Sequence, residues 1–190
     1  MDYNELLAAI RVASPRIIGI DGRCCSGKTT LAARLQKDLG AELYHLDDYF
    51  LRPEQRSPER RAVPGENVDH ERFYEEVLLP LSKNEAPVTR RFDCKTLALC
   101  APVTHELRWP VICEGSYALN AQLRPAYDLK LLTTCSPETQ WERLCAREPE
   151  EKLPAFKTMW IPLEERWFGT LTKNDADIFI GTDELILPED

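Results

Sequence analysis

The segment from Gly22 to Thr29 constrains the fold of this chain more than any other. It reads GRCCSGKT and matches the phosphate-loop pattern G-x-x-x-x-G-K-[ST]. A β-branched run, 16–21, comes before it, and residues 28–39 follow with leucines on one helical face and Gly40 at their end. A strand, a glycine-spaced loop and a helix in this order predict backbone N–H groups that surround phosphate oxygens at a helix N-terminus.

The chemistry of such loops predicts the ligand and its contacts. The Lys28 ammonium would reach the β- and γ-phosphates of a nucleoside triphosphate, and the Thr29 hydroxyl would bind Mg²⁺. We therefore expect ATP with Mg²⁺, although a strand–turn–helix whose glycines serve only the turn has the same local pattern. The residues expected to hold the nucleotide are Gly22, Cys24, Cys25, Ser26, Gly27, Lys28, Thr29 and Thr30.

The rest of the chain alternates strand-like and helix-like segments. Further strands are expected at 42–46, 88–92, 110–113, 129–133 and 177–180. Further helices are expected at 3–12, 71–79, 136–147 and 155–171, the last with a second helical piece that starts at Pro162. Two stretches, 52–69 and 95–105, are expected to be irregular. This alternation predicts an α/β fold with a mostly parallel sheet covered by helices on both faces.

The composition limits the partners and the cellular setting. With 190 residues, the chain is expected to form a single domain, residues 1–190. Lys and Arg number 24 against 32 Asp and Glu, a net charge of −8 without a basic stripe, which argues against nucleic acid as a partner. The start is neither basic nor apolar, no long apolar run occurs, and the seven cysteines contain no CxxC pair. We expect a cytoplasmic protein with reduced thiols, no zinc site and no membrane contact. A small-molecule anionic ligand is compatible with this charge because one local pocket can hold phosphate, and an oligomer is possible but not indicated.

Carboxylates follow two of the expected strands where those strands end. Asp47 and Asp48 come directly after 42–46, and Glu114 comes after 110–113. Ligands bind beyond the carboxyl ends of parallel strands, so Asp47 and Glu114 are expected beside the phosphate loop. Successive side chains on an extended segment face opposite ways, so only one of Asp47 and Asp48 is expected to point at the site. The expected metal ligands are Thr29, Asp47 and Glu114, although each carboxylate taken alone is typical of a solvated loop charge.

A family resemblance extends over most of the chain. Taken in order, the phosphate loop and the segments HLDDYF, NVDHERF, RRFDCKT, VICEGSY, ERLCARE and NDADIFI resemble the uridine kinase family of P-loop kinases, which is related to phosphoribulokinase and bacterial pantothenate kinase. The resemblance runs from Ile17 to Ile180. It implies a P-loop NTPase fold with a five-stranded parallel sheet, flanking helices and a mobile lid. It also implies transfer of the γ-phosphoryl group of ATP to a hydroxyl of a nucleoside similar to uridine or cytidine.

The resemblance further implies roles for individual side chains. Asp47 matches the base that accepts the proton of the attacking sugar hydroxyl. Asp69 matches the carboxylate that holds the ribose hydroxyls, and Phe92-Asp93 matches the Tyr-Asp pair beside the nucleobase. These residues would form the acceptor half of the site.

Arg143 and Arg147 match arginines of the lid. Two arginines at positions i and i+4 repel each other on a helix, and an anion that faces both would explain the pairing. A solvated helix face balanced by neighbouring glutamates is the alternative. The expected catalytic residues are then Asp47, Lys28, Arg143 and Arg147.

The sequence departs from the family in two places. No histidine follows Phe92-Asp93 before His105, although uridine–cytidine kinases carry one there to read the base, and the lid segment reads REPEEKLPAF without the usual arginine and glycine. A kinase for another hydroxyl-bearing metabolite, similar to pantothenate or a sugar, is therefore a second hypothesis. The four arginines of 52–61 could serve a phosphorylated acceptor, although the glutamates there are typical of a solvated loop. A nucleotide-dependent switch or assembly ATPase is a third hypothesis, but it would have no use for Asp69.

Two further features carry expectations of their own. Cys24 and Cys25 lie beside a helix N-terminus, which can lower a thiol pKa, so oxidation there would block the phosphate site; small loop-filling residues are the alternative. In 155–171, four apolar positions at helical spacing are expected to lie in the core: Trp160, Leu163, Trp167 and Leu171.

Overall fold

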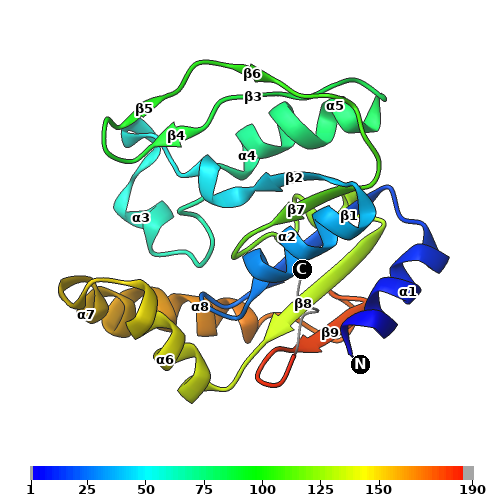
Figure 1. Ribbon diagram of the computed structural model, residues 1–190. Coiled ribbons are helices and arrows are strands. Elements are labelled where there is room, and N and C mark those ends of the chain that lie inside the picture. The colour runs from blue at the N-terminus through cyan, green and yellow to red at the C-terminus, as the bar shows by residue number, and fades with distance from the viewer. Residues whose placement is uncertain (1, 186–190) are drawn as a thin grey trace.

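The computed structural model describes residues 2–185, so residue 1 and residues 186–190 of the expected domain lie outside the described residues. Its centre is a five-stranded sheet in the order β2-β7-β1-β8-β9, in which all neighbouring strands run parallel (Figure 1). The strands are β1 (Ile17–Gly22), β2 (Glu42–His45), β7 (Val111–Glu114), β8 (Leu129–Thr134) and β9 (Ile178–Gly181). The predicted α/β fold with a parallel sheet is confirmed.

Strand β1 lies in the middle of the sheet, and this position explains its apolar sequence. All of its residues are buried, as is typical of a parallel strand covered on both faces. The register pairs Ile20 of β1 and His45 of β2 with Glu114 of β7, so these three strands finish at the same edge. The candidate site lies at that edge.

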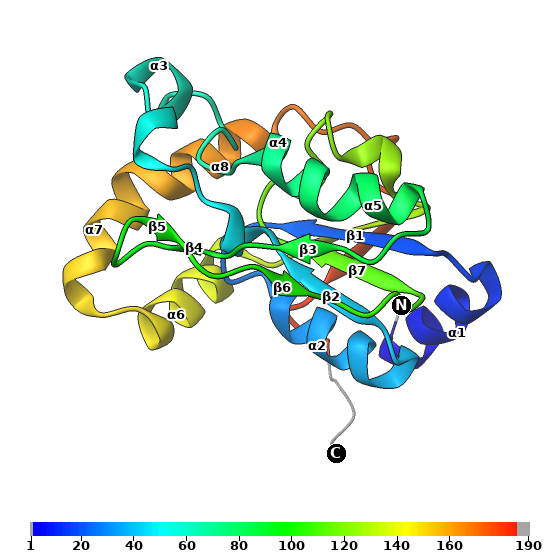
Figure 2. The ribbon, with the colours of Figure 1, turned by 90° about the horizontal axis from the view of Figure 1, so that it is seen from above.

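Helices α1 (Tyr3–Ala13) and α2 (Lys28–Leu39) cover one face of the sheet. Figure 2 shows them on the opposite side from α4 and α5. Helix α1 starts at a capping box, in which the side chains of Asp2 and Glu5 each accept a backbone N–H from the other residue. Helix α2 ends at Gly40 in the left-handed conformation, as the sequence predicts.

A continuous helical run covers the other face. It consists of α4 (His70–Phe73), a π-helical turn (Tyr74–Leu78) and α5 (Leu79–Ser82), and is longer than the predicted helix at 71–79. The π-turn closes where Leu79 N–H donates to Tyr74 O. Pro80 follows, and because proline has no N–H, the regular bonding pattern could not continue through it.

The prediction of a strand at 88–92 is wrong for the main sheet. Residues 88–104 instead form a separate antiparallel hairpin, in which β3 (Val88–Thr89) pairs with β6 (Val103–Thr104) and β4 (Phe92–Asp93) pairs with β5 (Ala98–Leu99). Val88 and Val103 are 46% and 55% exposed, so the apolar pattern here does not join the core. The stretch 95–105, predicted to be irregular, contains the returning strands of this hairpin.

Short helical segments lie at the edge where the strands finish. Segment 52–69 contains a 3₁₀ turn (Pro53–Gln55) and α3 (Pro58–Arg61). A further 3₁₀ turn (Arg124–Ala126) precedes β8 and therefore lies at the opposite edge of the sheet. After β8 come α6 (Pro137–Arg147), a 3₁₀ turn (Glu150–Lys152), α7 (Leu153–Ala155), a π-turn (Phe156–Trp160) and α8 (Ile161–Phe168). Figure 1 shows α3 and the α6–α8 segment at this end of the molecule. Among residues 2–185, no helix is both long and apolar enough to cross a bilayer.

Of the four positions predicted to lie in the core in the helical run that ends with α8, two pack against the core and two do not. Trp167 and Leu171 pack against the core, as predicted. Trp160 and Leu163 instead line cavities at the edge where the strands finish, so the prediction is wrong for these two residues. Helical spacing identifies residues on a common face, but it does not show what that face contacts.

Candidate active site

The phosphate loop keeps its shape through contacts with β8. A Cβ atom at Gly22 would lie 2.1 Å from Thr133 Oγ1 and 2.6 Å from Thr133 O, so only glycine fits. Ser26 Oγ and Thr133 Oγ1 share a hydrogen bond of 2.6 Å. Gly22 and Ser26 therefore shape the loop from behind. The other predicted nucleotide-binding residues line the cavity in front of it: Cys24, Cys25, Gly27, Lys28, Thr29 and Thr30.

Lys28 is held inside the loop with 8% of its surface exposed. Its Nζ donates to Arg23 O at 2.8 Å and to Ser116 Oγ at 3.3 Å, and neither acceptor carries a negative charge. The positive N-terminal end of α2 lies beside this ammonium. The loop, the helix end and Lys28 therefore form a site for an anion such as a triphosphate.

Asp21 is a buried carboxylate that the sequence analysis missed. It accepts hydrogen bonds from the backbone N–H groups of Gly22, Tyr117 and Leu119 at 2.6, 2.9 and 3.0 Å. Burial raises the pKa of this carboxyl to about 6, against the opposing effect of the N–H donors. The side chain ties the phosphate loop to the segment after β7. An acidic residue inside an apolar strand was the signal in the sequence.

Thr29 and Glu114, two of the three predicted metal ligands, lie together. Thr29 Oγ1 is 3.3 Å from both carboxylate oxygens of Glu114. His45 Nδ1 is 2.5 Å from Glu114 Oε1, and this hydrogen bond raises the pKa of the histidine. Mg²⁺ binds proteins through one or two carboxylates and completes its shell with water and substrate phosphates. The hydroxyl and carboxylate oxygens present here fit that ion.

Asp47, the third predicted ligand and predicted base, lies in the same cavity. Strand β2 ends at His45, and Leu46–Tyr49 form a 3₁₀ turn in place of the extended segment that was predicted. Asp47 lines the cavity and Asp48 is not among the described residues that do, so only one of the pair faces the site, as predicted. Although the Asp47 side chain is open to the cavity, the surrounding walls raise its pKa, and Lys28 opposes this shift.

The two predicted lid arginines, Arg143 and Arg147 of α6, both line the cavity. Arg143 donates to Thr182 O at 2.7 Å and to Cys25 O at 3.3 Å, which fastens α6 to the phosphate loop. Arg147 pairs with Glu148 at 3.0 Å, and its side chain is 52% exposed. Arg143 is therefore fixed in position, whereas Arg147 has the freedom to follow a bound anion.

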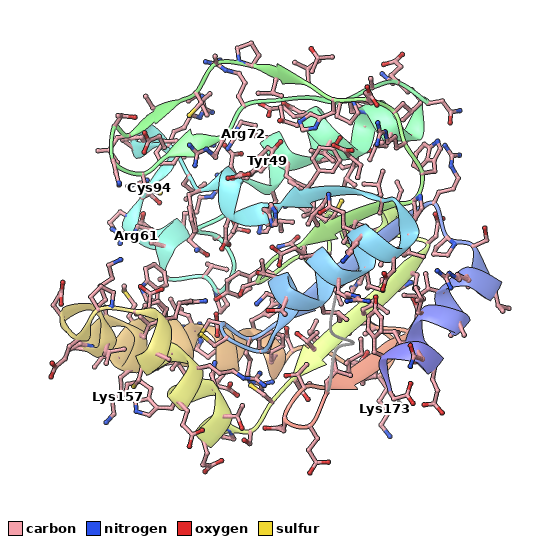
Figure 3. The ribbon with its side chains drawn as sticks, in the orientation of Figure 1. Tyr49, Arg61, Arg72, Cys94, Lys157 and Lys173 are labelled. Atoms are coloured by element: carbon pink, nitrogen blue, oxygen red, sulfur yellow. The ribbon has the colours of Figure 1, made fainter. Side chains whose placement is uncertain are left out.

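Asp69, predicted to bind an acceptor hydroxyl, lies in a buried ion pair. It caps α4 by accepting from Arg72 N at 3.1 Å, and its Oδ2 lies 3.4 Å from Arg72 Nε. The Arg72 guanidinium also lies over the ring of Tyr49, 4.2 Å from its centroid, and both residues are labelled in Figure 3. The structure therefore supplies an ion-pair partner within the protein for the Asp69 carboxylate, but the buried Oδ2 atom accepts no hydrogen bond from any described residue.

Phe92 and Asp93, the other predicted acceptor contacts, lie on β4 of the hairpin. Phe92 is buried, with the Arg56 guanidinium 5.4 Å from its ring centroid. Asp93 accepts from Lys95 N at 2.8 Å, and such backbone donors lower its pKa. Within the part of the chain that the structure describes, neither residue lines the cavity that holds Asp47.

Glu164 of α8 is a cavity residue that the sequence analysis missed. Its Oε2 accepts from Cys24 N at 2.9 Å, and its Oε1 lies 3.4 Å from Ser116 Oγ. Burial raises the pKa of this carboxyl. The next residue, Glu165, forms an ion pair with Arg23, so α8 is attached to the phosphate loop by two adjacent carboxylates. The acidic pair within the apolar segment WIPLEERWF was the only signal in the sequence.

One cavity of about 830 Å³ is lined by the phosphate loop together with Asp47, Glu114, Glu164 and the two arginines. Besides the phosphate loop, its lining includes Phe50, Asn67 and Trp160, which belong to segments outside the main sheet. The volume lies within the range of small-molecule sites. The cavity therefore brings together the loop, the predicted base, the Thr29–Glu114 pair and the two arginines.

Comparison with solved structures finds the same fold in two proteins whose descriptions name kinases. A protein described as a "Possible Uridine Kinase" from Bacillus stearothermophilus is 20% identical and superimposes with a TM-score of 0.71 over 93% of this chain and 96% of its own. A "putative fructose transport system kinase" from Silicibacter sp. TM1040 is 18% identical, with a TM-score of 0.75 over 94% of this chain and 98% of its own. No family model and no curated protein matches the sequence. At these identities the likeness establishes the fold, which is the one that the family resemblance implied.

Proposed function

We propose that this protein is an ATP-dependent small-molecule kinase that transfers the γ-phosphoryl group of ATP to a hydroxyl group. The observation that carries the proposal is that one cavity contains both a phosphate loop and Asp47, a carboxylate able to accept a proton. A nucleotide-dependent switch would need a water-orienting group. It would not need a cavity that continues past the phosphate loop to Asn67 and Trp160, as this one does. The cavity supports transfer to a second substrate.

The residues divide the work of phosphoryl transfer. Lys28 and the loop N–H groups would hold the triphosphate, and Thr29 and Glu114 would hold Mg²⁺, which supplies charge neutralisation at the phosphates when bound. The hydroxyl oxygen of the acceptor forms a bond to the γ-phosphorus, and Asp47 accepts the proton of that hydroxyl. The bond from that phosphorus to the β–γ bridging oxygen breaks, and ADP leaves. Lys28 and Arg147 stabilise the negative charge on the transferring group.

The acceptor is the open part of the proposal. The family resemblance and the Bacillus stearothermophilus neighbour favour a nucleoside similar to uridine or cytidine. Another hydroxyl-bearing metabolite is favoured because Asp69 already has Arg72 as an ion-pair partner, although its Oδ2 accepts no hydrogen bond from the described residues, and because Arg56 lies over Phe92. None of the described residues Asp69, Phe92 and Asp93 lines the cavity of Asp47.

Release of ADP from Mg·ATP, with and without a panel of nucleosides, sugars and hydroxy acids, tests this function. We expect at least one acceptor to stimulate ADP release and to be recovered as a phosphate ester. Lys28→Ala should abolish that release, because it removes the ammonium that holds the phosphates. Turnover that does not depend on any acceptor would point to the switch or assembly ATPase and would refute the kinase proposal.

A further inference from the structure

Two cavities adjoin the active-site cavity, and arginines line both of them. The larger, of about 550 Å³, has Arg56, Arg61 and Arg166 in its lining, and the smaller, of about 260 Å³, has Arg56 and Arg61. Both share Asn67 and Trp160 with the cavity that contains Asp47. We call this pair of spaces the arginine cavity. Figure 3 shows Arg61 on α3, at the end of the molecule where the strands finish.

The four arginines of segment 52–61 differ in their partners. Arg52 lies 3.4 Å from Glu54, and Arg60 lies 2.7 Å from Glu71, so these two are matched by carboxylates. Arg56 donates through Nε to a carbonyl, that of Leu51, at 2.9 Å. For the Arg61 side chain, residues 2–185 provide no hydrogen bond or ion pair. The two arginines without a carboxylate partner are the two that line the arginine cavity.

The third arginine comes from the opposite segment. Arg166 of α8 makes one weak contact, from Nη1 to Ala62 O at 3.4 Å, which is also a neutral acceptor. No Asp or Glu occurs among the described residues that line the arginine cavity. Three guanidinium groups without a matching negative charge are unusual in a chain whose net charge is −8. Like charges held together repel, so an anion that bound among them would stabilise the arrangement.

We propose that the arginine cavity binds a phosphate or carboxylate group of the acceptor, so that the substrate is a hydroxyl compound with an anionic tail. This inference rests on the proposed kinase function. Guanidinium groups bind phosphates and carboxylates through paired N–H donors. Met159, Trp160 and Leu163 supply an apolar wall for the carbon chain between the anion and the hydroxyl. Because Asn67 and Trp160 border both spaces, the hydroxyl end of such a molecule would enter the cavity of Asp47.

Matched acceptor pairs test the inference. ADP release would be measured with ribose against ribose 5-phosphate and with glycerol against glycerate, in the wild type and in Arg61→Gln and Arg166→Gln. Both side chains are exposed, so their removal leaves the core intact. Arg108→Gln is the matched control, because Arg108 is exposed and paired with Glu106 at 2.5 Å, and it is not part of the arginine cavity. The phosphate and carboxylate members distinguish the two anion types.

We expect kcat/KM for an anionic member to exceed that of its neutral partner at least about tenfold. Each variant should raise KM for the anionic member by about 10–100-fold, the effect of losing a hydrogen bond to a charged group, while kcat changes little and the neutral partner is unaffected. The proposal of an anionic acceptor is overturned if both members of a pair turn over equally, or if neutral uridine is preferred, and Arg61→Gln has no effect. The proposed kinase function would not be affected by that result.

A binding measurement separates the two proposals if no acceptor is phosphorylated. The protein would be saturated with Mg·AMP-PNP to fill the phosphate loop, and ribose 5-phosphate and glycerate would be titrated by calorimetry. Binding that weakens at least about tenfold in Arg61→Gln but not in Arg108→Gln would support the arginine cavity and refute only the kinase function. Absence of binding, or equal binding in both variants, would overturn the cavity as an anion site.

Discussion

Replacement of Asp47 by asparagine is the most direct test of the proposed chemistry. Asparagine keeps the size of the side chain and one hydrogen-bonding oxygen, but it cannot take up a proton. General-base catalysis contributes about 10²–10⁴-fold in rate, so kcat should fall by that factor, or about 3–5 kcal/mol in the activation free energy. The substitution also removes one of two negative charges, those of Asp47 and Glu114, that would repel the triphosphate. The KM for ATP should therefore stay the same or fall, whereas damage to the fold would raise it.

The dependence on pH gives a second readout of the same variant. The cavity walls raise the pKa of Asp47, and a base must be ionised to act. Wild-type kcat/KM should therefore fall as the pH drops through this raised pKa, and the residual activity of Asp47→Asn should lack that decline. A coupled assay of ADP release with the best acceptor of the panel measures both effects.

Asp48→Asn is the matched control for Asp47→Asn. Asp48 lies in the same 3₁₀ turn but is not among the described residues that line the cavity. We expect the control to keep wild-type turnover and its pH profile. The assignment of the base is refuted if Asp47→Asn keeps more than about a tenth of the activity, or if Asp48→Asn loses more than Asp47→Asn does.

Three further predictions concern the phosphate loop and its support. Gly22→Ala should lower the free energy of unfolding by about 3 kcal/mol, because the new Cβ would lie 2.1 Å from a side-chain oxygen of β8. Gly27→Ala has its nearest contact at 3.5 Å, so it should lower the free energy of unfolding by only about 1–2 kcal/mol, the effect of placing alanine in a left-handed backbone conformation. Urea unfolding compares the two, and equal losses would contradict the steric explanation. The neighbouring Cys24 lowers the pKa of Cys25, so alkylation of Cys25 by iodoacetamide should be half-maximal below the ordinary value of about 8.5 and should be slowed by ATP. A midpoint at or above about 8.5 would contradict this. Burial raises the Asp21 pKa from 3.8 to about 6, so the folded state binds this proton more tightly than the unfolded state does. Relative to Asp21→Asn, the free energy of unfolding should therefore fall by about 3 kcal/mol between about pH 4 and pH 7, and parallel profiles would exclude this linkage.

The donor side of the site follows from the sequence because its geometry is local or set by the sheet. The phosphate loop needs only a strand, glycines and a helix in succession. Asp47 and Glu114 lie far apart in the chain, but Asp47 follows β2 and Glu114 is the last residue of β7, and parallel strands finish at one edge. The convergence of these residues is therefore a consequence of alternating strands and helices, which periodicity reveals.

The acceptor side could not be predicted in the same way, because it depends on which charges pair in space. The ion pair of Asp69 with Arg72 depends on the N-cap geometry of α4. The hairpin at 88–104 escaped prediction because its apolar residues have the same pattern as a sheet strand, yet Val88, Leu97 and Val103 remain exposed. Glu164 reaches the phosphate loop only because α8 packs there, and no local pattern in the sequence records that docking.

Asp21 and the bond between Ser26 and Thr133 anchor the phosphate loop to the centre of the sheet. The arginine cavity, in contrast, is built from segments 50–67, 94 and 158–166, which carry no strand of that sheet. The described residues that line the arginine cavity do not include Glu164 and Glu165, so substitutions of the lining residues would change the shape and charge of the cavity while the contacts of these two glutamates with the phosphate loop remain. For the proposed kinase, this division would allow related chains to differ in acceptor while they keep the same transfer chemistry.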